Sequence, residues 1–387
     1  MGSCRCGNPL PERSGPGRTR QYCSDRCRKQ AQREREACEG VTKSPVTKLE
    51  DVRFYCGLSN RYWSYHPARP GPYACVAPMC GKTQATRTMN YVTLPDETVA
   101  VLLDSSAFSD KQRLSFEEAR NRQIAHAYRF GYASRVSHVA SYDLLIDEKW
   151  RDGERSKIRW SREEAEEAVR ETVAAAHYLA RQRRALRGAY GHRVGLALSA
   201  QGVEVEQYLR CTEQIVSLLE DGDLFALGGW CITGLLPDAV LPSFCEIMSE
   251  VIPYLGKSGV KRVHIWGVMF PQALGYLLYL CDQYQIQLST DSSGPERYPT
   301  LGQWGYSSWR NNAYRKPPVF SSCRTVDQQG NRLPTCPPAL RCLGQERIRH
   351  VQLTREWLAD FRSREAALYR PIVLPAYRQL SWMEAAG

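Results

Sequence analysis

The sequence predicts an α/β protein built on a (β/α)8 TIM barrel, with a small N-terminal module that resembles a zinc ribbon. Short β-branched apolar runs alternate with long amphipathic helical patterns through most of the 387 residues. Continuous apolar strands separated by helices are typical of a parallel sheet that helices cover. No G-x-G-x-x-G motif follows the first strand, which disfavours a dinucleotide-binding sheet.

Seven apolar runs are expected to form strands. Seven candidates spread over about 240 residues fit an eight-stranded barrel better than a doubly wound sheet. The stretch Ser59–Val92 is rich in Pro, Gly, Tyr and Arg, so we expect a long irregular loop or insertion there. The expected strands are Val52–Gly57, Val99–Asp104, Leu144–Asp147, Val194–Ser199, Leu224–Gly228, Val263–Val268 and Ile286–Thr290.

Helical periodicity lies between the later strands. The first long helix is expected over Ser161–Leu186, because Ser161-Arg-Glu-Glu164 is a capping box that satisfies backbone donors at a helix start. Glu204–Leu219, Pro242–Tyr254 and Pro271–Tyr284 show the same apolar spacing. Each follows one of the expected strands, as a barrel of repeated strand–helix units requires.

Residues 1–40 form the predicted N-terminal module, and residues 46–387 the predicted barrel domain. Two close pairs, Cys4 with Cys6 and Cys23 with Cys27, flank a loop rich in Pro, Gly and Arg. Four thiolates spaced in this way can hold Zn²⁺, which would supply the folding energy of so short a peptide. The alternative is a disordered basic tail in which the cysteines are incidental.

Charge and cysteine content narrow the class of partner and the compartment. Lys and Arg total 52 against 41 Asp and Glu, and the net charge of +11 favours a polyanionic partner, nucleic acid first. An odd count of 15 cysteines and a polar, Arg-rich N-terminus disfavour a secreted disulfide framework. No segment is long enough to span a membrane. We therefore predict a cytoplasmic protein that does not act at a membrane.

Polar or aromatic residues follow most of the expected strands, where the active site of a barrel lies. Each could be a turn or helix-capping residue with no function. Together, however, they offer carboxylates, an amide, backbone groups and aromatic rings. The motifs are Asp104-Ser-Ser-Ala-Phe108, Asp147-Glu148, Gln201-Gly202, Gly228-Gly229-Trp230, Trp266-Gly267 and Asp291-Ser-Ser-Gly294.

The order of these motifs resembles that of the queuine/archaeosine tRNA-guanine transglycosylases, most closely their DNA-directed relatives of the DpdA type. The resemblance covers about residues 95–295 and rests on four motifs of that family. Its DSGGF resembles 104–108, its VQGG resembles 199–202, its VGGL resembles 227–230 and its LMGV resembles 265–268. Departures include Ala107 for the second glycine of SGGF, and Ser109 for the following glutamine.

The resemblance implies a base-exchange reaction at one nucleotide. Asp291 would be the nucleophile that attacks C1′ and expels guanine, and Asp104 would be the general acid/base. Asp147 and Gln201 would bind the polar edge of the base, and Gly228 and Gly229 would lie at the substrate, with the backbone N–H of Gly229 or Trp230 donating to the base carbonyl. Phe108 and Trp266 would stack on the ring, although both could equally pack the barrel mouth.

The resemblance also implies ligands and partners. The incoming base would be a 7-deazaguanine such as preQ0, and a duplex DNA substrate would have to flip its guanine out of the stack. The MPTR motif of the tRNA enzymes is replaced by Ser292-Ser-Gly-Pro-Glu-Arg297, which favours DNA over tRNA. Helper proteins and a homodimer are further expectations. A second zinc site is predicted at Cys323, Cys336, Cys342 and His350.

Three other functions stay open at this point. One is the same exchange on tRNA, and another is a non-catalytic nucleic-acid-binding barrel. The third is an unrelated barrel glycosidase, since two carboxylates at a barrel mouth also serve glycoside hydrolysis.

Overall fold

A computed structural model of the chain describes most of residues 52–293, and all of the described residues belong to the unit Glu50–Gly387. The module predicted for residues 1–40 therefore lies outside the described part, and so does the predicted C-terminal zinc region. The described residues are 52–58, 71–78, 92, 94–107, 110, 113–144, 146, 149–151, 154–156, 161–230, 237–269, 271–293, 354–355 and 358–359.

Eight parallel strands close into a barrel, in the order β1-β10-β9-β8-β7-β4-β3-β2. The last strand returns to the first, where Tyr55 of β1 pairs with Asp291 of β10. This topology confirms the predicted (β/α)8 fold class. The strands are β1 (Arg53–Leu58), β2 (Tyr73–Val76), β3 (Ala100–Leu103), β4 (Val136–Ala140), β7 (Gly195–Ala200), β8 (Leu224–Leu227), β9 (Arg262–Ile265) and β10 (Gln287–Ser292).

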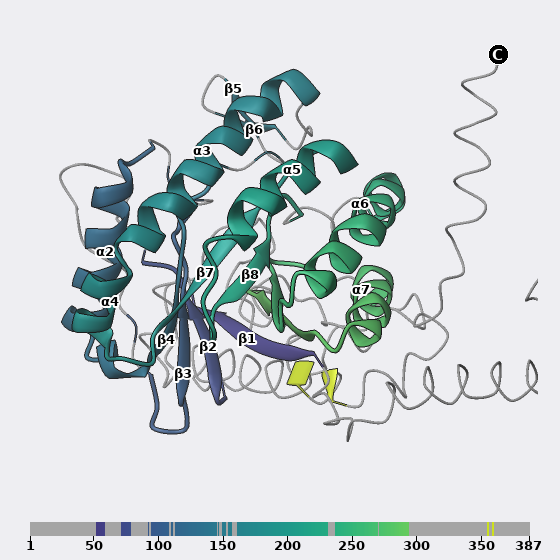
Figure 1. The fold of residues 1–387 in the computed structure, drawn as a ribbon. Helices are drawn as coiled ribbons and strands as arrows, with labels where there is room; N and C mark the ends of the chain where they lie inside the picture. Colours follow the sequence, from purple (N-terminus) through teal and green to yellow (C-terminus); the bar gives the residue numbers. More distant parts are fainter. Residues whose placement is uncertain are drawn as a thin grey trace, which may run out of the picture. The chain divides into compact units, whose positions relative to one another are not determined.

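Helices between the strands form the outer layer of the barrel (Figure 1). Two of them begin with a complete capping box. Ser161 and Glu164 form the box of α3, as predicted, and Ser115 and Glu118 form the box of α2, a helix that the sequence analysis did not predict. The helices are α2 (Phe116–Arg129), α3 (Arg162–Arg181), α4 (Arg183–Tyr190), α5 (Val205–Val216), α6 (Pro237–Lys257) and α7 (Pro271–Gln283). A single 3₁₀ turn, η3 (Ala133–Arg135), precedes β4.

Two strand assignments made from the sequence are wrong. The run Leu144–Asp147 is not a barrel strand: β4 lies upstream at Val136–Ala140. Ile146 is apolar because it packs in a small cluster with Ala165 and Ala168 of α3. The predicted loop Ser59–Val92 contains the strand β2, whose four residues are too few to give a periodic signal between prolines.

An additional hairpin lies between β4 and α3. Its strands β5 (Lys149–Arg151) and β6 (Glu154–Ser156) pair antiparallel, and an Asp-Gly dipeptide joins them. The hairpin lies at the same end of the barrel as the start of α3 (Figure 1).

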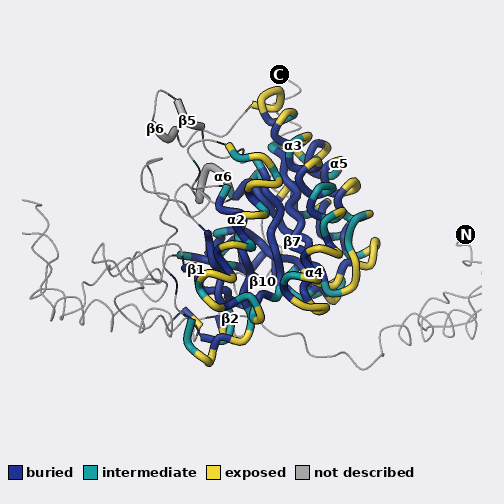
Figure 2. The backbone as a smooth tube through the Cα atoms, turned by 90° about the vertical axis from the view of Figure 1, so that its left-hand side faces the viewer, coloured by how far each residue is buried: buried dark blue, intermediate teal, exposed yellow. Residues whose placement is uncertain are grey.

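The apolar core has two parts. The larger part fills the space between the strands and the helices, while exposed residues lie on the outer faces of the helices (Figure 2). The smaller part fills the inside of the barrel, where alanines on some strands make room for large rings on others. Its members are Tyr55, Cys75, Leu102, Ala140, Ala197, Leu224, Ala226 and Trp266.

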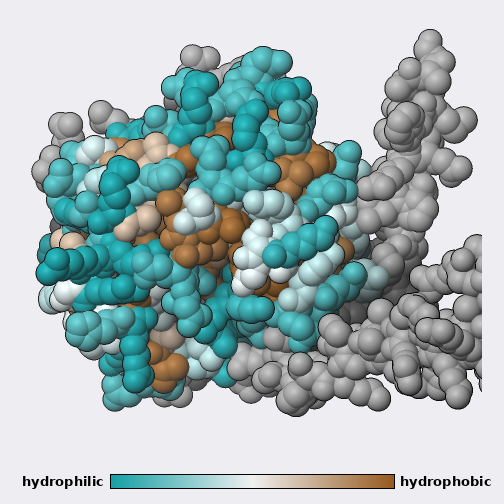
Figure 3. Space-filling view, viewed as in Figure 1, coloured by the Kyte–Doolittle hydropathy of each residue, from teal (hydrophilic) through white to brown (hydrophobic). Residues whose placement is uncertain are grey.

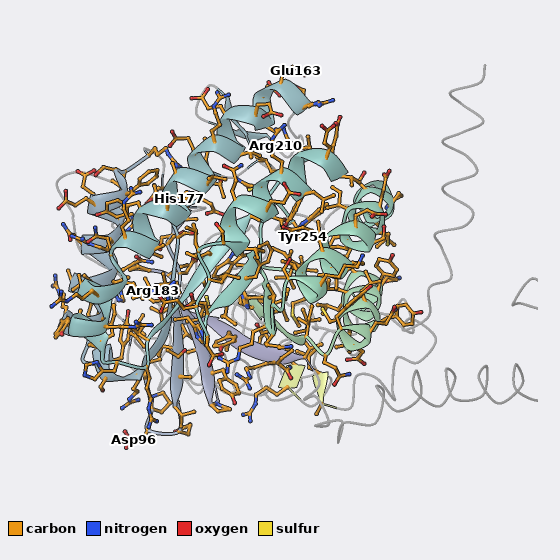
Figure 4. All side chains as sticks on the ribbon, viewed as in Figure 1. Asp96, Glu163, His177, Arg183, Arg210 and Tyr254 are labelled. Atoms are coloured by element: carbon orange, nitrogen blue, oxygen red, sulfur yellow. The ribbon has the colours of Figure 1, made fainter. Side chains whose placement is uncertain are left out.

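The surface follows the same division. On the face shown in Figure 3, hydrophilic residues cover most of the helices and hydrophobic residues show mainly between them. Asp96 before β3 and Glu163 in the first turn of α3 mark the two opposite ends of the barrel (Figure 4). Within the described ranges, no helix is long and apolar enough to cross a membrane.

Candidate active site at the carboxyl end of the barrel

Side chains that could carry chemistry stand where the barrel strands end. Neighbouring strands of a parallel barrel end on the same side, so these residues form a continuous arc around its mouth. Going round from β10 to β3, the arc consists of Asp291, Trp266, Gly228, Gln201, Asp143 and Asp104.

Asp104 is the first residue after β3, and two backbone hydrogen bonds fix it there. Its own N–H donates to the carbonyl of Val76 at 2.9 Å, and its Oδ1 accepts the N–H of Ser106 at 3.2 Å. Burial raises the pKa of Asp104 to about 6, and the negative charge of Asp291 raises it further in the same direction. The structure therefore brings together the two carboxylates that the sequence singled out.

Side chains of α2 hold the loop that carries Asp104. The amide of Gln123 donates to the carbonyls of Asp104 at 3.1 Å and Ala140 at 3.0 Å, which ties the ends of β3 and β4 together. Arg122 donates to the carbonyl of Ser105 at 2.6 Å and pairs with both carboxylate oxygens of Asp110. Because each link is buried or half-buried, the loop has a well-defined backbone path near Asp104.

Asp291 lies near the end of β10, with its side chain 17% exposed. Its Oδ1 accepts the N–H of Gly267 at 2.8 Å and lies 3.3 Å from Nε2 of His264. Both contacts reach the same oxygen, so one side of the carboxylate is anchored in the barrel wall. Asp291 thus has the fixed geometry that a nucleophile needs.

His264 is a site residue that sequence reasoning missed. It is fully buried inside the barrel. The centroid of its ring lies 4.4 Å from that of Trp266 and 5.8 Å from that of Tyr55, and both ring pairs pack edge to face. His264 lies in β9 and Trp266 directly follows it, and the period-two alternation of a strand turns both side chains toward the inside of the barrel. That alternation was the available signal, because Trp266 was already a candidate.

The ends of β4, β7 and β8 form a second polar group, which we call the base-side cluster: Asp143, Gln201, Gly228 and Gly229. A Cβ atom added at Gly228 would lie 3.2 Å from the carbonyl oxygen of Ala200, 3.4 Å from Oδ2 of Asp143 and 3.6 Å from Cβ of Gln201. The backbone of Gly228 therefore lies close to both of these side chains. Gly229 has φ of 80°, and a Cβ there would meet Ile146 at 3.0 Å.

Within this cluster, Asp143 is a residue that the sequence analysis did not single out. It is buried beside the mouth, three residues after the end of β4 at Ala140. Asp147 itself lies outside the described residues. The N–H of Gly228 donates to the carbonyl of Ala200 at 2.8 Å, which joins the ends of β7 and β8.

Gln201 is fully buried and has one unsatisfied atom. Its Nε2 donates to the carbonyl of Leu144 and to Oγ1 of Thr172. Its Oε1 has no hydrogen-bond partner among the residues that the structure describes. A buried acceptor without a partner costs free energy, so this oxygen is a natural point for a ligand donor.

Trp266 serves the barrel interior rather than an open stacking surface. Its indole N–H donates to Oγ of Ser199 at 3.0 Å, and its ring belongs to the inner apolar cluster with only 9% exposure. Phe108, the other predicted stacking residue, lies outside the described residues. The packing interpretation of Trp266 therefore fits better than the stacking one.

Neither predicted zinc site falls within the described residues. This applies to Cys4, Cys6, Cys23 and Cys27, and equally to Cys323, Cys336, Cys342 and His350. In the described part, no group of three or more His, Cys, Asp or Glu side chains could hold a metal ion. Zn²⁺ stays a prediction from the sequence.

Cys75 of β2 lies inside the barrel below the carboxylates. Burial raises the pKa of its thiol well above the usual range, and the charges of Asp291 and Asp104 act in the same direction. The thiol therefore stays protonated and is a poor nucleophile, since the thiolate is the reactive form.

Comparisons with known proteins concern the fold only. No protein-family model matches the sequence, and a search of curated proteins finds no significant match. Among solved structures, an L-ribulose 3-epimerase has a TM-score of 0.34 and 12% identity, covering 83% of this chain and 99% of that chain. A D-allulose 3-epimerase from Methylomonas sp. has a TM-score of 0.32 and 10% identity, covering 79% of this chain and 99% of that one. These values do not bear on the substrate.

Proposed function

We propose that this protein is a pentosyltransferase that replaces guanine in DNA with a 7-deazaguanine such as preQ0. The observation that carries the proposal is the electrostatic coupling of Asp104 and Asp291 at the barrel mouth. Two carboxylates in different environments are what covalent exchange at an anomeric carbon requires, because one must attack while the other handles a proton.

The reaction has two symmetrical halves. Asp291 attacks C1′, the bond from C1′ to N9 of guanine breaks, and the electron pair leaves with the base. Asp104 donates its proton to the departing base, which leaves a glycosyl ester on Asp291. In the second half, Asp104 takes a proton from the incoming 7-deazaguanine, whose nitrogen attacks C1′ and releases Asp291.

The pKa of Asp104 suits both halves. A group with a pKa of about 6, raised first by burial and then by the charge of Asp291, is found in both protonation states near neutral pH. Such a group can donate a proton and later take one back without a large free-energy cost in either direction.

The base-side cluster supports a guanine-like base. Guanine presents a ring N–H and an amino group on one edge, both of which are donors. The carboxylate of Asp143 and the unsatisfied Oε1 of Gln201 are acceptors, and both side chains lie close to Gly228. Guanine and 7-deazaguanines share this edge and differ at ring position 7, so the same cluster can read both the leaving and the incoming base.

The choice of DNA rests on the sequence. A net charge of +11 fits phosphate contacts, which supply much of the affinity of nucleic-acid-binding proteins. A barrel mouth can receive a base only after that base has left the stack. Exchange on tRNA is the alternative. Helper proteins, a homodimer and a cytoplasmic location remain predictions from the sequence.

The test is incorporation of labelled preQ0 into duplex DNA, with tRNA offered in the same reaction. We expect label in DNA, no label with Asp291→Asn, and wild-type labelling with Asp221→Asn. Asp221 is an exposed carboxylate in the turn before β8, at the opposite end of the barrel, and so is a matched control. A denaturation-resistant adduct between wild-type protein and DNA would demonstrate the glycosyl-enzyme. Label in tRNA alone would establish the alternative, and absence of both label and adduct would contradict exchange.

A further inference from the structure

The carboxylate of Asp110, in the loop between β3 and α2, accepts hydrogen bonds from two directions. Arg122 of α2 donates to Oδ1 at 2.6 Å and to Oδ2 at 2.9 Å. The hydroxyl of Tyr142, which follows β4, donates to Oδ2 at 2.8 Å. The side chains of Arg122 and Asp110 are 5% and 13% exposed, and Tyr142 is buried as well. Asp110 therefore links the loop after β3 to the loop after β4.

The chemistry of the donors fixes the direction of these hydrogen bonds. A guanidinium group can only donate, so both contacts of Arg122 run toward Asp110. The hydroxyl of Tyr142 accepts the N–H of Leu114 at 3.1 Å, and burial raises the pKa of this hydroxyl to about 12. It therefore keeps its proton and can donate it to Asp110.

Each end of this link lies next to one carboxyl group of the candidate site. Arg122 also donates to the carbonyl of Ser105 at 2.6 Å, and Ser105 directly follows Asp104. At the other end, Tyr142 directly precedes Asp143. The link thus runs from the backbone beside the proposed general acid/base to the backbone beside the carboxylate of the base-side cluster.

Arg113 forms a second link between the same two loops. Its guanidinium donates to the carbonyl of Asp143 at 3.1 Å, and its central carbon lies 5.0 Å from the centroid of the Tyr142 ring. It also pairs with Glu171 of α3 at 3.3 Å, where both side chains are partly exposed. The contact through Asp110 is the more buried of the two links, so we expect it to contribute more to the restraint.

We propose that Asp110 is a positioning residue that holds the loop of Asp104 against the loop of Asp143. Arg122 and Tyr142 transmit this restraint. The link between the loops is independent of the proposed function, whereas its effect on catalysis rests on that function. A general acid must lie within hydrogen-bond reach of the base that it protonates, so a shift of one loop against the other would slow proton transfer.

The link itself is tested by amide hydrogen exchange at Ser106, whose N–H donates to Oδ1 of Asp104 at 3.2 Å. Tyr142→Phe removes a single hydroxyl from the other loop, and we expect the Ser106 amide to exchange about 10-fold faster in this variant. The matched control is Tyr178→Phe, at a half-buried tyrosine of α3, which should leave the rate unchanged. The amide of Asp223, at the opposite end of the barrel, should keep its rate in both variants. An unchanged rate at Ser106 in Tyr142→Phe would overturn the proposal, and so would an equal acceleration at Asp223.

The catalytic effect is tested by kinetics of preQ0 incorporation, with activity expressed per folded protein. We expect kcat to fall about 10-fold in Tyr142→Phe and about 100-fold in Asp110→Asn, with KM changed less than about threefold because Asp143 is retained. Asp221→Asn, at an exposed carboxylate, should behave as wild type.

The double variant of Tyr142 and Asp110 decides whether the two residues act through one link. Its kcat should equal that of Asp110→Asn alone, because the second substitution removes nothing more. Losses that multiply in the double variant would overturn the proposal, and so would a wild-type kcat in Asp110→Asn. If the wild-type protein exchanges no base but Tyr142→Phe accelerates exchange of the Ser106 amide, the proposed function fails while the link between the loops stands.

Discussion

Asp104 and Asp291 end strands β3 and β10, which two other strands separate in the barrel, and yet the charge of Asp291 helps to raise the pKa of Asp104. The charge of one residue thus acts on the carboxyl group of another that lies 187 positions away in the sequence. The coupling depends on barrel closure, because only the return of β10 to β1 brings Asp291 near the end of β3. The protonation of Asp104 therefore depends on the pH and on the presence of the Asp291 carboxylate.

The first prediction is that Asp104→Asn stabilises the protein while abolishing base exchange. The folded protein holds the pKa of Asp104 at about 6, above the ordinary value of 3.8 for an aspartate, so ionising this group opposes folding. The protonated carboxyl of Asp104 contributes fully to the free energy of unfolding below about pH 4, and this contribution is lost as the pH rises through 6. Because Asp104 is only half-buried, we expect a gain of about 1–2 kcal/mol at pH 7.5. Urea denaturation of both proteins at pH 7.5 and pH 4 measures it.

The gain from Asp104→Asn should shrink at pH 4, where the wild-type carboxyl is already protonated. Equal stability of the variant and the wild type at pH 7.5 would contradict the burial argument. A less stable variant would indicate that Asp104 serves to cap the loop between β3 and α2 instead.

The second prediction concerns the coupling itself. Asp291→Asn removes the negative charge that acts on Asp104, and burial remains, so the pKa of Asp104 should fall below 6 but stay above its ordinary value. Titration of the side-chain carboxyl by ¹³C NMR in both proteins measures the change. An unchanged pKa of Asp104 would show that the two carboxylates do not interact.

Two of the strands predicted correctly, β7 and β8, are buried at every residue, so the sequence shows runs that are apolar except for Ser199. β4 was missed because it reads Val-Ser-His-Val-Ala, with two polar residues that bond within the barrel. Ser137 donates to the carbonyl of Val101, and His138 lies 3.0 Å from the carbonyl of Gly222. Because these partners are distant in the sequence, the apolar pattern of neighbouring residues does not indicate that β4 is a buried strand.

The candidate site divides in a similar way. Asp104, Gln201 and Asp291 could be found because each directly follows a recognisable apolar strand. Asp143 could not, since its position depends on where β4 ends, and the apolar run at 144–146 drew the strand assignment downstream. For His264, strand alternation with Trp266 predicts an inward-facing side chain, but its contacts with Ser289 and Asp291, 25 and 27 residues away, are set by the fold.

The third prediction separates Asp143 from Asp147. If Asp143 binds the amino and ring N–H groups of the base, Asp143→Asn replaces an acceptor by an amide that also donates, and kcat/KM for preQ0 should fall about 10- to 100-fold. Asp147→Asn is the matched variant, only four positions away, and we expect less than about a threefold change from it. Incorporation rates at several preQ0 concentrations measure both. A larger effect at Asp147 would restore the original assignment.

The fourth prediction concerns His138, which lies inside the barrel and takes no part in the chemistry. Burial lowers its pKa from the ordinary histidine value of 6.5 to about 4, so the folded state disfavours the charged ring. Between about pH 4 and 6.5 the unfolded chain binds the proton more readily, and the free energy of unfolding should rise with pH over this window and level off above it. A shift of this size corresponds to about 3 kcal/mol in total.

His138→Gln keeps a side chain that can donate to the carbonyl of Gly222 but cannot be protonated. The variant should therefore lose that pH-dependent slope, measured by urea denaturation at pH 4.5, 5.5, 6.5 and 7.5. Asp104 acts in the opposite sense over part of the same window, because its raised pKa lowers stability as the pH rises. The double variant with Asp104→Asn isolates the contribution of His138. If the slope survives in His138→Gln, another group must cause it, and the neutral assignment of this ring would be wrong.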